Sequence, residues 1–128
     1  VRRYKQNLQN VLGISFQKID DGLKTTFKDF SLFIDPKLFG LDRNQLAEEL
    51  LKLNVQTKKY FYPPLHEQRA YAKFKEAYHN ILPVTAKVSR GVLSIPLYSH
   101  MTAEEVDQVC EAIQTIHEQA LTKEVKTI

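Results

Sequence analysis

The 128-residue chain is poor in the residues that define several classes of protein. It has one cysteine, Cys110, which excludes an internal disulfide framework and fits a reducing compartment, so we expect a cytoplasmic location. No apolar run approaches the roughly 20 residues that span a bilayer, and no signal-peptide pattern opens the chain. We therefore expect no membrane partner.

The sequence also lacks glycine-rich phosphate-binding motifs and the residue spacings typical of metal sites. Four glycines cannot compose GxGxxG or GxxxxGK[ST], the loops that bind phosphates, and no GxSxG nucleophile elbow is present. The four histidines and Cys110 show neither HExxH nor CxxC spacing. We expect Cys110 to be buried as a small hydrophobic residue. We expect His117 to pack against the core or to compensate the helix dipole near the C-terminal end of its helix. The sequence predicts no catalytic residue, no cofactor-binding residue and no metal ligand within this chain.

The charge is nearly balanced. The net charge of +3 comes from 18 basic and 15 acidic residues that are mostly interspersed, which is weak support for an anionic partner. The composition, 43% hydrophobic and 26% charged, is typical of a globular protein. By length, residues 1–128 form a single domain.

The N-terminal segment, residues 1–12, has a helical pattern. Tyr4, Leu8 and Val11 fall on one face of this helix, and no residue that caps helices precedes it. We expect it to be the end of a longer helix that links this domain to a preceding one. Cut off from that neighbour, its apolar face is expected to be exposed and to promote association.

Strand and helix patterns alternate through the next segments. Residues 14–19 and 25–35 predict a β-hairpin, and residues 43–53 predict a helix that begins at a capping box formed by Asp42 and Gln45. Residues 55–61 predict a short strand, for which we expect a βαβ-like return to the same sheet.

The C-terminal half begins with an irregular stretch. A short helix over 84–90, a strand over 92–98 and a long helix that starts at the capping box of Thr102 and Glu105 follow it. Residues 122–128 are expected to be a polar tail. The fold class is α/β, an α+β two-layer sandwich, with a small antiparallel or mixed sheet of three to four strands and helices mainly on one face.

One stretch, KKYFYPPLHEQ at 58–68, concentrates side chains that stack, carry charge or exchange protons. Two interpretations are open. One ring can pack into the core by strand alternation, or the basic and aromatic side chains can stack on a ligand, including nucleic-acid bases. The two prolines favour a stiff loop that presents Tyr62, Leu65 and His66 at fixed positions.

Two segments, KYFYPPLHEQRAY and LPVTAKVSRGVLSIPLYSHMTAEEVDQVCEAI, together resemble the C-terminal part of the DegT/StrS-type nucleotide-sugar aminotransferases. The similar motifs lie at 60–66, 82–84, 90–98 and 101–106, and FGLDRNQLAEELLKLNV also fits. The resemblance covers nearly the whole chain. It departs at Ser99 and His100, where the family often has a proline.

The resemblance implies that this chain is the C-terminal small domain of a pyridoxal-phosphate enzyme with the aspartate-aminotransferase fold. Its partners would be the N-terminal large domain, a second subunit in a homodimer, and a nucleotide-sugar substrate. The reaction would transfer an amino group, usually from glutamate, to a keto sugar on a nucleotide diphosphate. The lysine that binds the cofactor would lie in the large domain, so the isolated chain is expected to be inactive.

By position in the family loop, Tyr60, Tyr62, His66 and Lys59 are expected to face the sugar pocket. Arg90 is expected to be structural, either capping a short helix or pairing with an acid. One alternative keeps the family but changes the reaction, since some relatives are dehydratases or regulatory proteins with a histidine in place of the lysine. The second is a stand-alone nucleic-acid-binding module. Because no RNP1-like string is present and the charges nearly balance, we expect no nucleic-acid partner.

Overall fold

The computed structural model describes residues 1–78 and 81–125. The three strands are β1 (Ile14–Phe16), β2 (Phe30–Ile34) and β3 (Val92–Ile95). The α-helices are α1 (Arg2–Leu8), α2 (Pro36–Phe39), α3 (Arg43–Lys52), α4 (Lys75–Tyr78), α5 (Pro83–Gly91) and α6 (Ala103–Val125). Two 3₁₀ helices, η1 (Leu65–Glu67) and η2 (Arg69–Phe74), precede α4.

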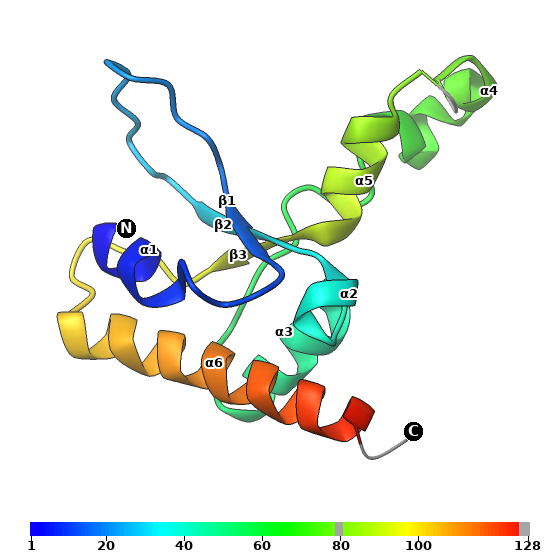
Figure 1. The fold of residues 1–128 in the computed structure, drawn as a ribbon. Coiled ribbons are helices and arrows are strands. Elements are labelled where there is room, and N and C mark those ends of the chain that lie inside the picture. The colour runs from blue at the N-terminus through cyan, green and yellow to red at the C-terminus, as the bar shows by residue number, and fades with distance from the viewer. Residues whose placement is uncertain (79–80, 126–128) are drawn as a thin grey trace.

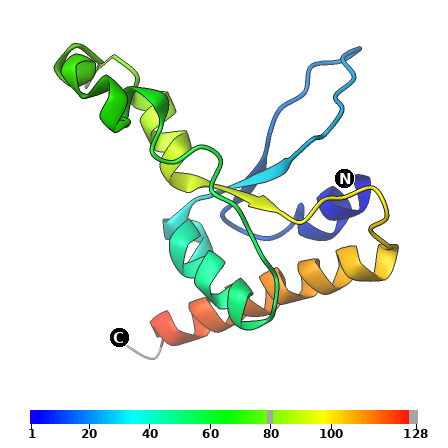
Figure 2. The ribbon, with the colours of Figure 1, turned by 180° about the vertical axis from the view of Figure 1, so that it is seen from behind.

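The sheet is antiparallel throughout, with strand order β1-β2-β3. Ile14 of β1 lies opposite Ile34 of β2, and Phe30 of β2 lies opposite Ile95 of β3. α1, α3 and α6 lie to one side of this sheet, and α6 packs against both α1 and α3 (Figures 1 and 2). The predicted α/β sandwich with a small sheet and helices mainly on one face is confirmed.

The core forms between the sheet and α6. Alternate residues of β2, Phe30, Leu32 and Ile34, are buried, as strand periodicity requires. The apolar stripe of α6 meets them, and its buried members are Val106, Val109, Cys110, Ile113, Ile116 and Ala120. Packing of His117 and Cys110 against the core is also confirmed, since both are buried and the His117 Nδ1 donates to the Phe39 carbonyl at 2.9 Å.

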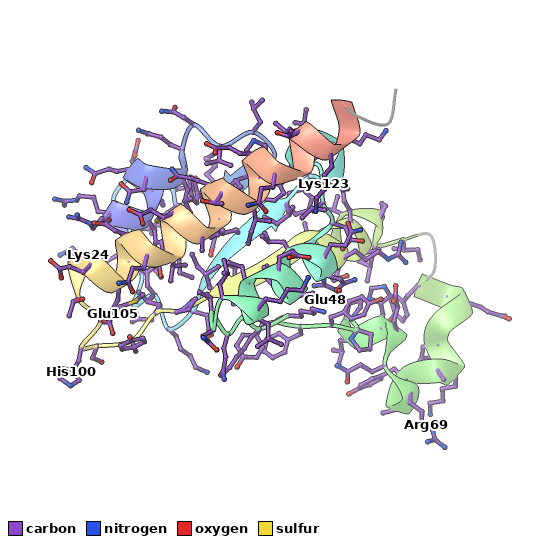
Figure 3. The ribbon with its side chains drawn as sticks, turned by 90° about the horizontal axis from the view of Figure 1, so that it is seen from below. Lys24, Glu48, Arg69, His100, Glu105 and Lys123 are labelled. Atoms are coloured by element: carbon purple, nitrogen blue, oxygen red, sulfur yellow. The ribbon has the colours of Figure 1, made fainter. Side chains whose placement is uncertain are left out.

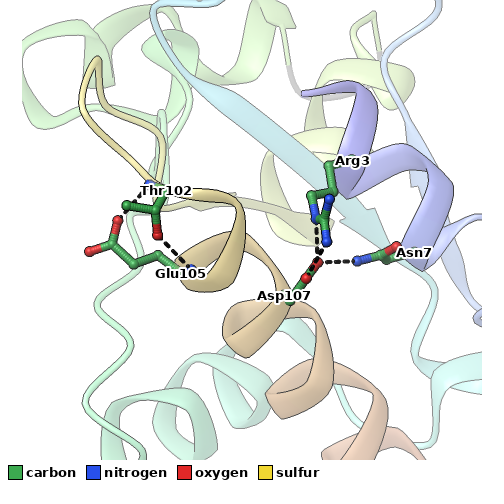
Figure 4. A network of polar contacts seen from close by, with 5 residues as sticks. All are labelled: Arg3, Asn7, Thr102, Glu105 and Asp107. Carbon is green, nitrogen blue, oxygen red and sulfur yellow. Dashed lines mark hydrogen bonds and ion pairs between the residues drawn. The ribbon is translucent and has the colours of Figure 1, made fainter.

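Polar contacts fasten α1 to α6 (Figure 4). The Arg3 guanidinium donates to both carboxylate oxygens of Asp107, with Nε 2.6 Å from Oδ1, and the Asn7 amide donates to Oδ1 at 2.8 Å. These bonds, with that of Arg3 first, hold the pKa of Asp107 below its usual value. The predicted capping box is also present, because the Thr102 amide donates to Glu105 and the Glu105 amide donates to Thr102 Oγ1.

The expected exposure of the first helix is wrong. α1 ends at Leu8 rather than near residue 12, and Tyr4 and Leu8 are completely buried. The sheet and α6 cover this face, and the Tyr4 hydroxyl donates to the Pro96 carbonyl at 2.8 Å. Burial raises the pKa of Tyr4. The apolar stripe therefore belongs to this domain's own core.

The predicted strand at 55–61 is also wrong. Only Lys58 pairs with β3 in this segment, through two backbone bonds to Ser94 of 2.9 and 2.7 Å. The chain turns at Asn54, whose φ is 60°, and no βαβ return exists among the described residues because every strand pairing is antiparallel. β3 ends at Ile95 rather than at residue 98, since Pro96 has no amide hydrogen for a ladder.

A projecting arm consists of η1, η2, α4 and α5, and it extends away from α6 (Figure 1). α5 confirms the helix predicted over 84–90, and its last residues lead directly into β3. At the other end of the chain, α6 continues to Val125, within the stretch predicted as a polar tail. Residues 126–128 of that predicted tail lie outside the described part of the chain.

Candidate substrate-binding loop

The segment 58–68 leaves the sheet edge at Lys58 and enters η1 at Leu65, so it forms a loop between β3 and the arm. Its three aromatic side chains are exposed, with Tyr60 at 37%, Phe61 at 76% and Tyr62 at 51%. Pro64 is buried at the start of η1. Packing of one ring into the core, the first interpretation of this stretch, is therefore wrong, and the rings are available to a ligand.

Tyr60 and its lysine neighbours form the first part of the loop. The Tyr60 ring lies 5.3 Å from the Phe61 ring, and the Lys58 ammonium lies 5.4 Å from the Tyr60 centroid. A hydrogen bond to Tyr60 raises the pKa of Lys58. Lys59 is exposed. This end of the loop therefore carries two cations, of which Lys58 lies beside an aromatic face.

Tyr62 lies against a cation from another element. The Arg43 guanidinium carbon, at the start of α3, is 4.6 Å from the Tyr62 ring centroid. Burial lowers the pKa of Arg43, whereas Tyr62 and Asp42 act in the opposite direction. One face of the Tyr62 ring is thus covered by protein, and about half of the residue remains exposed.

His66 is less accessible than a loop position predicts. Its side chain is 11% exposed, and its Nε2 lies 3.7 Å from Glu67 Oε1. The Arg90 guanidinium lies 3.6 Å from the same oxygen, so the structural role expected for Arg90, pairing with an acid, is confirmed. His66 also borders an apolar hollow of about 410 Å³, lined by Leu65, His66, Tyr71, Phe74, Tyr78, Leu82 and Thr85.

A second hollow of about 650 Å³ adjoins the first and shares Leu65 and Thr85 with it. Its walls come from the loop and from α5 with the start of β3, and are Tyr60, Phe61, Pro64, Leu65, Gln68, Val84, Thr85, Val88, Ser89 and Val92. The structure thus brings Tyr60 and His66 to two adjoining hollows. Tyr62 and Lys59 line neither.

A cavity of about 720 Å³ lies elsewhere, between the segment 53–58 and β3 with the start of α6. Of its two acids, Asp29 and Glu105, the second accepts hydrogen bonds from the Thr102 amide and then from the Tyr98 hydroxyl, which lower its pKa. Figure 3 shows Glu105 and His100 far from Arg69, which lies on the arm. This cavity is therefore separate from the arm that carries the hollow beside His66.

The sequence did not indicate that Arg43 contacts the loop or that Glu67 contacts a neighbouring element. Arg43 is the first residue of a capped helix, where a solvated arginine is ordinary, and no local pattern indicates its burial. Glu67 follows His66 directly, but its contact with Arg90 joins positions 23 residues apart. Both depend on contacts between elements, which sequence spacing does not give.

The described residues do not fit pyridoxal phosphate on their own. Schiff-base chemistry needs an amine whose pKa is depressed by burial or by a neighbouring cation. No lysine whose burial the structure describes is buried, and the pKa of Lys58 is raised rather than lowered. Nor do three His, Cys, Asp or Glu side chains group into a metal site within 1–78 and 81–125. None of the described helices is long and apolar enough to cross a membrane.

Known proteins share both sequence and fold with this chain. It is 27% identical over 110 residues to the dTDP-4-amino-4,6-dideoxy-D-glucose transaminase of Escherichia coli. The aligned residues cover 86% of this chain and 29% of that protein. The chain thus spans less than a third of the relative's length. Among solved structures, DesI in the presence of its TDP-sugar product gives a TM-score of 0.81 at 23% identity, covering 98% of this chain and 32% of that one.

A second solved structure extends the structural likeness. DesV of S. venezuelae, solved in complex with a ketimine intermediate, gives a TM-score of 0.80 at 21% identity, covering 91% of this chain and 30% of that one. At these identities the likeness establishes the fold, which is that of a part of the aspartate-aminotransferase-fold sugar aminotransferases. Residues 1–114 match the DegT/DnrJ/EryC1/StrS aminotransferase family. This match covers most of the chain, and the protein belongs to that family.

Proposed function

We propose that this chain is the C-terminal small domain of a pyridoxal-phosphate-dependent aminotransferase that transfers an amino group from glutamate to a keto sugar on a nucleotide diphosphate. The family match over residues 1–114 and the transaminase relatives support this proposal. The 29% share of the E. coli relative that the chain covers supports a domain of a larger enzyme. The nucleic-acid-binding alternative is not favoured by any of these relatives.

The observation that carries the proposal is the exposed aromatic loop beside the two adjoining hollows. Aromatic faces pack well against the apolar faces of sugar rings, and polar groups at the edge fix orientation. Tyr60 and His66 border these hollows and are placed to contact a sugar. Lys59 is an exposed cation and suits the diphosphate. The cofactor would supply the electron sink for amino transfer, held by residues outside this chain.

The test uses the full-length protein that contains this chain. We expect it to convert the 4-keto counterpart of a dTDP-4-amino-4,6-dideoxy sugar to the amine with glutamate as donor. His66→Ala should lower kcat/KM for the sugar by about tenfold or more, which corresponds to about 1.4 kcal/mol of lost transition-state contact.

The matched control is His100→Ala, because His100 is exposed and lies far from the arm (Figure 3). It should leave kcat/KM within about twofold of wild type. Loss of water from the sugar without amino transfer would contradict the proposed reaction. Equal effects of the two histidine variants would contradict the proposed role of the loop.

A further inference from the structure

Arg43 is a buried cation at the first position of α3, and its side chain joins three separate segments. The residue is 2% exposed. Its Nη1 donates to the carbonyl of Ser89 at 3.1 Å and to that of Val92 at 2.9 Å, where α5 passes into β3. Its Nε donates to Asn44 Oδ1 at 2.9 Å. These three hydrogen bonds fix the plane of the guanidinium independently of the loop 58–68.

The loop 58–68 is the third segment that this side chain contacts, through the ring of Tyr62. Its ring centroid lies 4.6 Å from the guanidinium carbon, at a distance typical of a cation–π contact. No salt bridge within the described residues includes Arg43, so the aromatic face contributes to compensating a charge that has left water. Such contacts are strongest where the cation is desolvated.

The loop has few other attachments near its centre. Lys58 is bonded to Ser94 at the sheet edge, and Pro64 is buried where η1 begins. Between these points, Tyr60 and Phe61 contact each other and are exposed. The contact between Arg43 and Tyr62 therefore holds the middle of the loop to the body of the domain.

We propose that Arg43 is a positioning residue for the substrate loop, which fixes the ring of Tyr62 and, through it, sets the affinity for the nucleotide-sugar acceptor. This inference rests on the proposed function. The planar arginine fork holds two backbone carbonyls while its face supports a ring, and a lysine ammonium cannot do both. The ring of Tyr62 lines neither hollow, but it is half exposed and lies between Phe61 and Pro64, which line the second one. Fixing this ring therefore fixes the adjoining wall of that hollow, and Arg43 itself stays out of contact with the ligand.

The first experiment does not depend on enzymatic activity. Hydrogen–deuterium exchange of the full-length protein should show at least about tenfold faster exchange over 58–68 in Arg43→Met and in Tyr62→Leu. Tyr62→Leu should leave exchange of α5 unchanged, because the Arg43 bonds to Ser89 and Val92 remain. Arg2→Met, which alters an exposed arginine on α1, is the matched control and should match wild type. Wild-type exchange over 58–68 in both variants would overturn the proposal.

The second experiment measures coupling in the full-length enzyme. Arg43→Lys should raise the KM for the keto-sugar nucleotide by about fivefold or more and leave the KM for glutamate within about twofold. In a Tyr62→Leu background the same change should add less than about twofold, because the residue through which Arg43 acts is gone. Additive effects, or equal changes in both KM values, would overturn the proposal.

The two experiments separate the possible failures. Absence of any amino transfer would contradict the proposed function, while the exchange result would still decide whether Arg43 anchors the loop. If Arg43→Met fails to fold, hydrogen–deuterium exchange over 58–68 is measured on Arg43→Lys instead, which keeps the positive charge. Where neither folds, Tyr62→Leu alone must loosen 58–68 and raise the sugar KM, and a tight loop with normal KM would reject the proposal.

Discussion

Gly13 and Gly22 share a left-handed backbone but differ in their surroundings. Their φ values are 81° and 83°, a region that side chains with a Cβ rarely adopt. A Cβ on Gly13 would lie 2.5 Å from the backbone nitrogen of Phe39, whereas one on Gly22 would meet nothing within 4 Å. Gly13 therefore permits a close approach of α2 in addition to its turn.

We expect Gly22→Ala to lower the free energy of unfolding by about 1 kcal/mol, the cost of the left-handed backbone alone. Gly13→Ala should cost at least about 3 kcal/mol, because backbone atoms of α2 must also move. Urea unfolding measures both values. Equal costs for the two substitutions would contradict the importance of the contact with Phe39.

Cys110 lies within the buried stripe of α6, 1% exposed. Burial, the largest cause, raises the pKa of its thiol to about 11. At about pH 8 the thiolate fraction is then on the order of one in a thousand. We expect no measurable reaction of the native protein with a disulfide reagent over minutes, and rapid stoichiometric reaction in guanidinium. Fast labelling of the native thiol would show that α6 opens readily.

Single residues also show where sequence reasoning stops. The stripe of Tyr4 and Leu8 was correctly identified as apolar, but its exposure was predicted wrongly, because periodicity shows which face is apolar and not what covers it. For the same reason the burial of Arg43 could not be foreseen. A loop that presents Tyr62 and His66 was predicted, since Pro63 cannot continue a strand. Tyr62 is 51% exposed, but the side chain of His66 is only 11% exposed.

At the scale of elements, α1 and α6 are joined through Asp107, whose pKa is held low first by the hydrogen bond from Arg3 and also by that from Asn7. A carboxylate with a lowered native pKa stabilises the fold above the unfolded pKa of about 3.9 and ceases to do so as pH falls through the native pKa. We expect Asp107→Asn to lower Tm at about pH 7, and the gap to wild type to close toward about pH 2.

The control for this experiment is Asp20→Asn, because the pair of Asp20 with Lys18 is largely exposed on the β1–β2 connection. Its effect on Tm should be close to zero at both pH values. A pH-independent loss of stability in Asp107→Asn would show that the side chain matters for packing and not for its charge.

Elements with local signals were predicted well, and those defined by distant pairing were not. The capping boxes at Asp42 and Thr102 fixed the starts of α3 and α6 within a residue. The supposed strand at 55–61 has suitable residue types, but a strand needs a partner, and only Lys58 meets one. The loop was found from its composition, whereas the two hollows beside it require α5, whose position the sequence does not give.

At the scale of the whole molecule, no lysine whose burial the structure describes is buried, and burial is one of the conditions that lower an amine pKa for Schiff-base chemistry. We expect the 128-residue chain alone, mixed with pyridoxal phosphate and reduced with borohydride, to show only weak labelling spread over several lysines. Mass spectrometry of the peptides measures this. The full-length protein should instead be labelled on one lysine outside this chain. Stoichiometric labelling of one lysine within residues 1–128 would contradict the domain proposal.

The pairing of α1 with α6 has a consequence for how the protein is made. Arg3 and Asp107 lie 104 residues apart in sequence, and Tyr4 and Leu8 are buried under elements that include α6. On a ribosome that adds about 5–20 residues per second, the first helix waits on the order of 5–20 s for its partner. During that interval the sides of Tyr4 and Leu8 that α6 covers in the folded domain are exposed on the nascent chain and accessible to chaperones. The domain can complete its core only when its last helix has emerged.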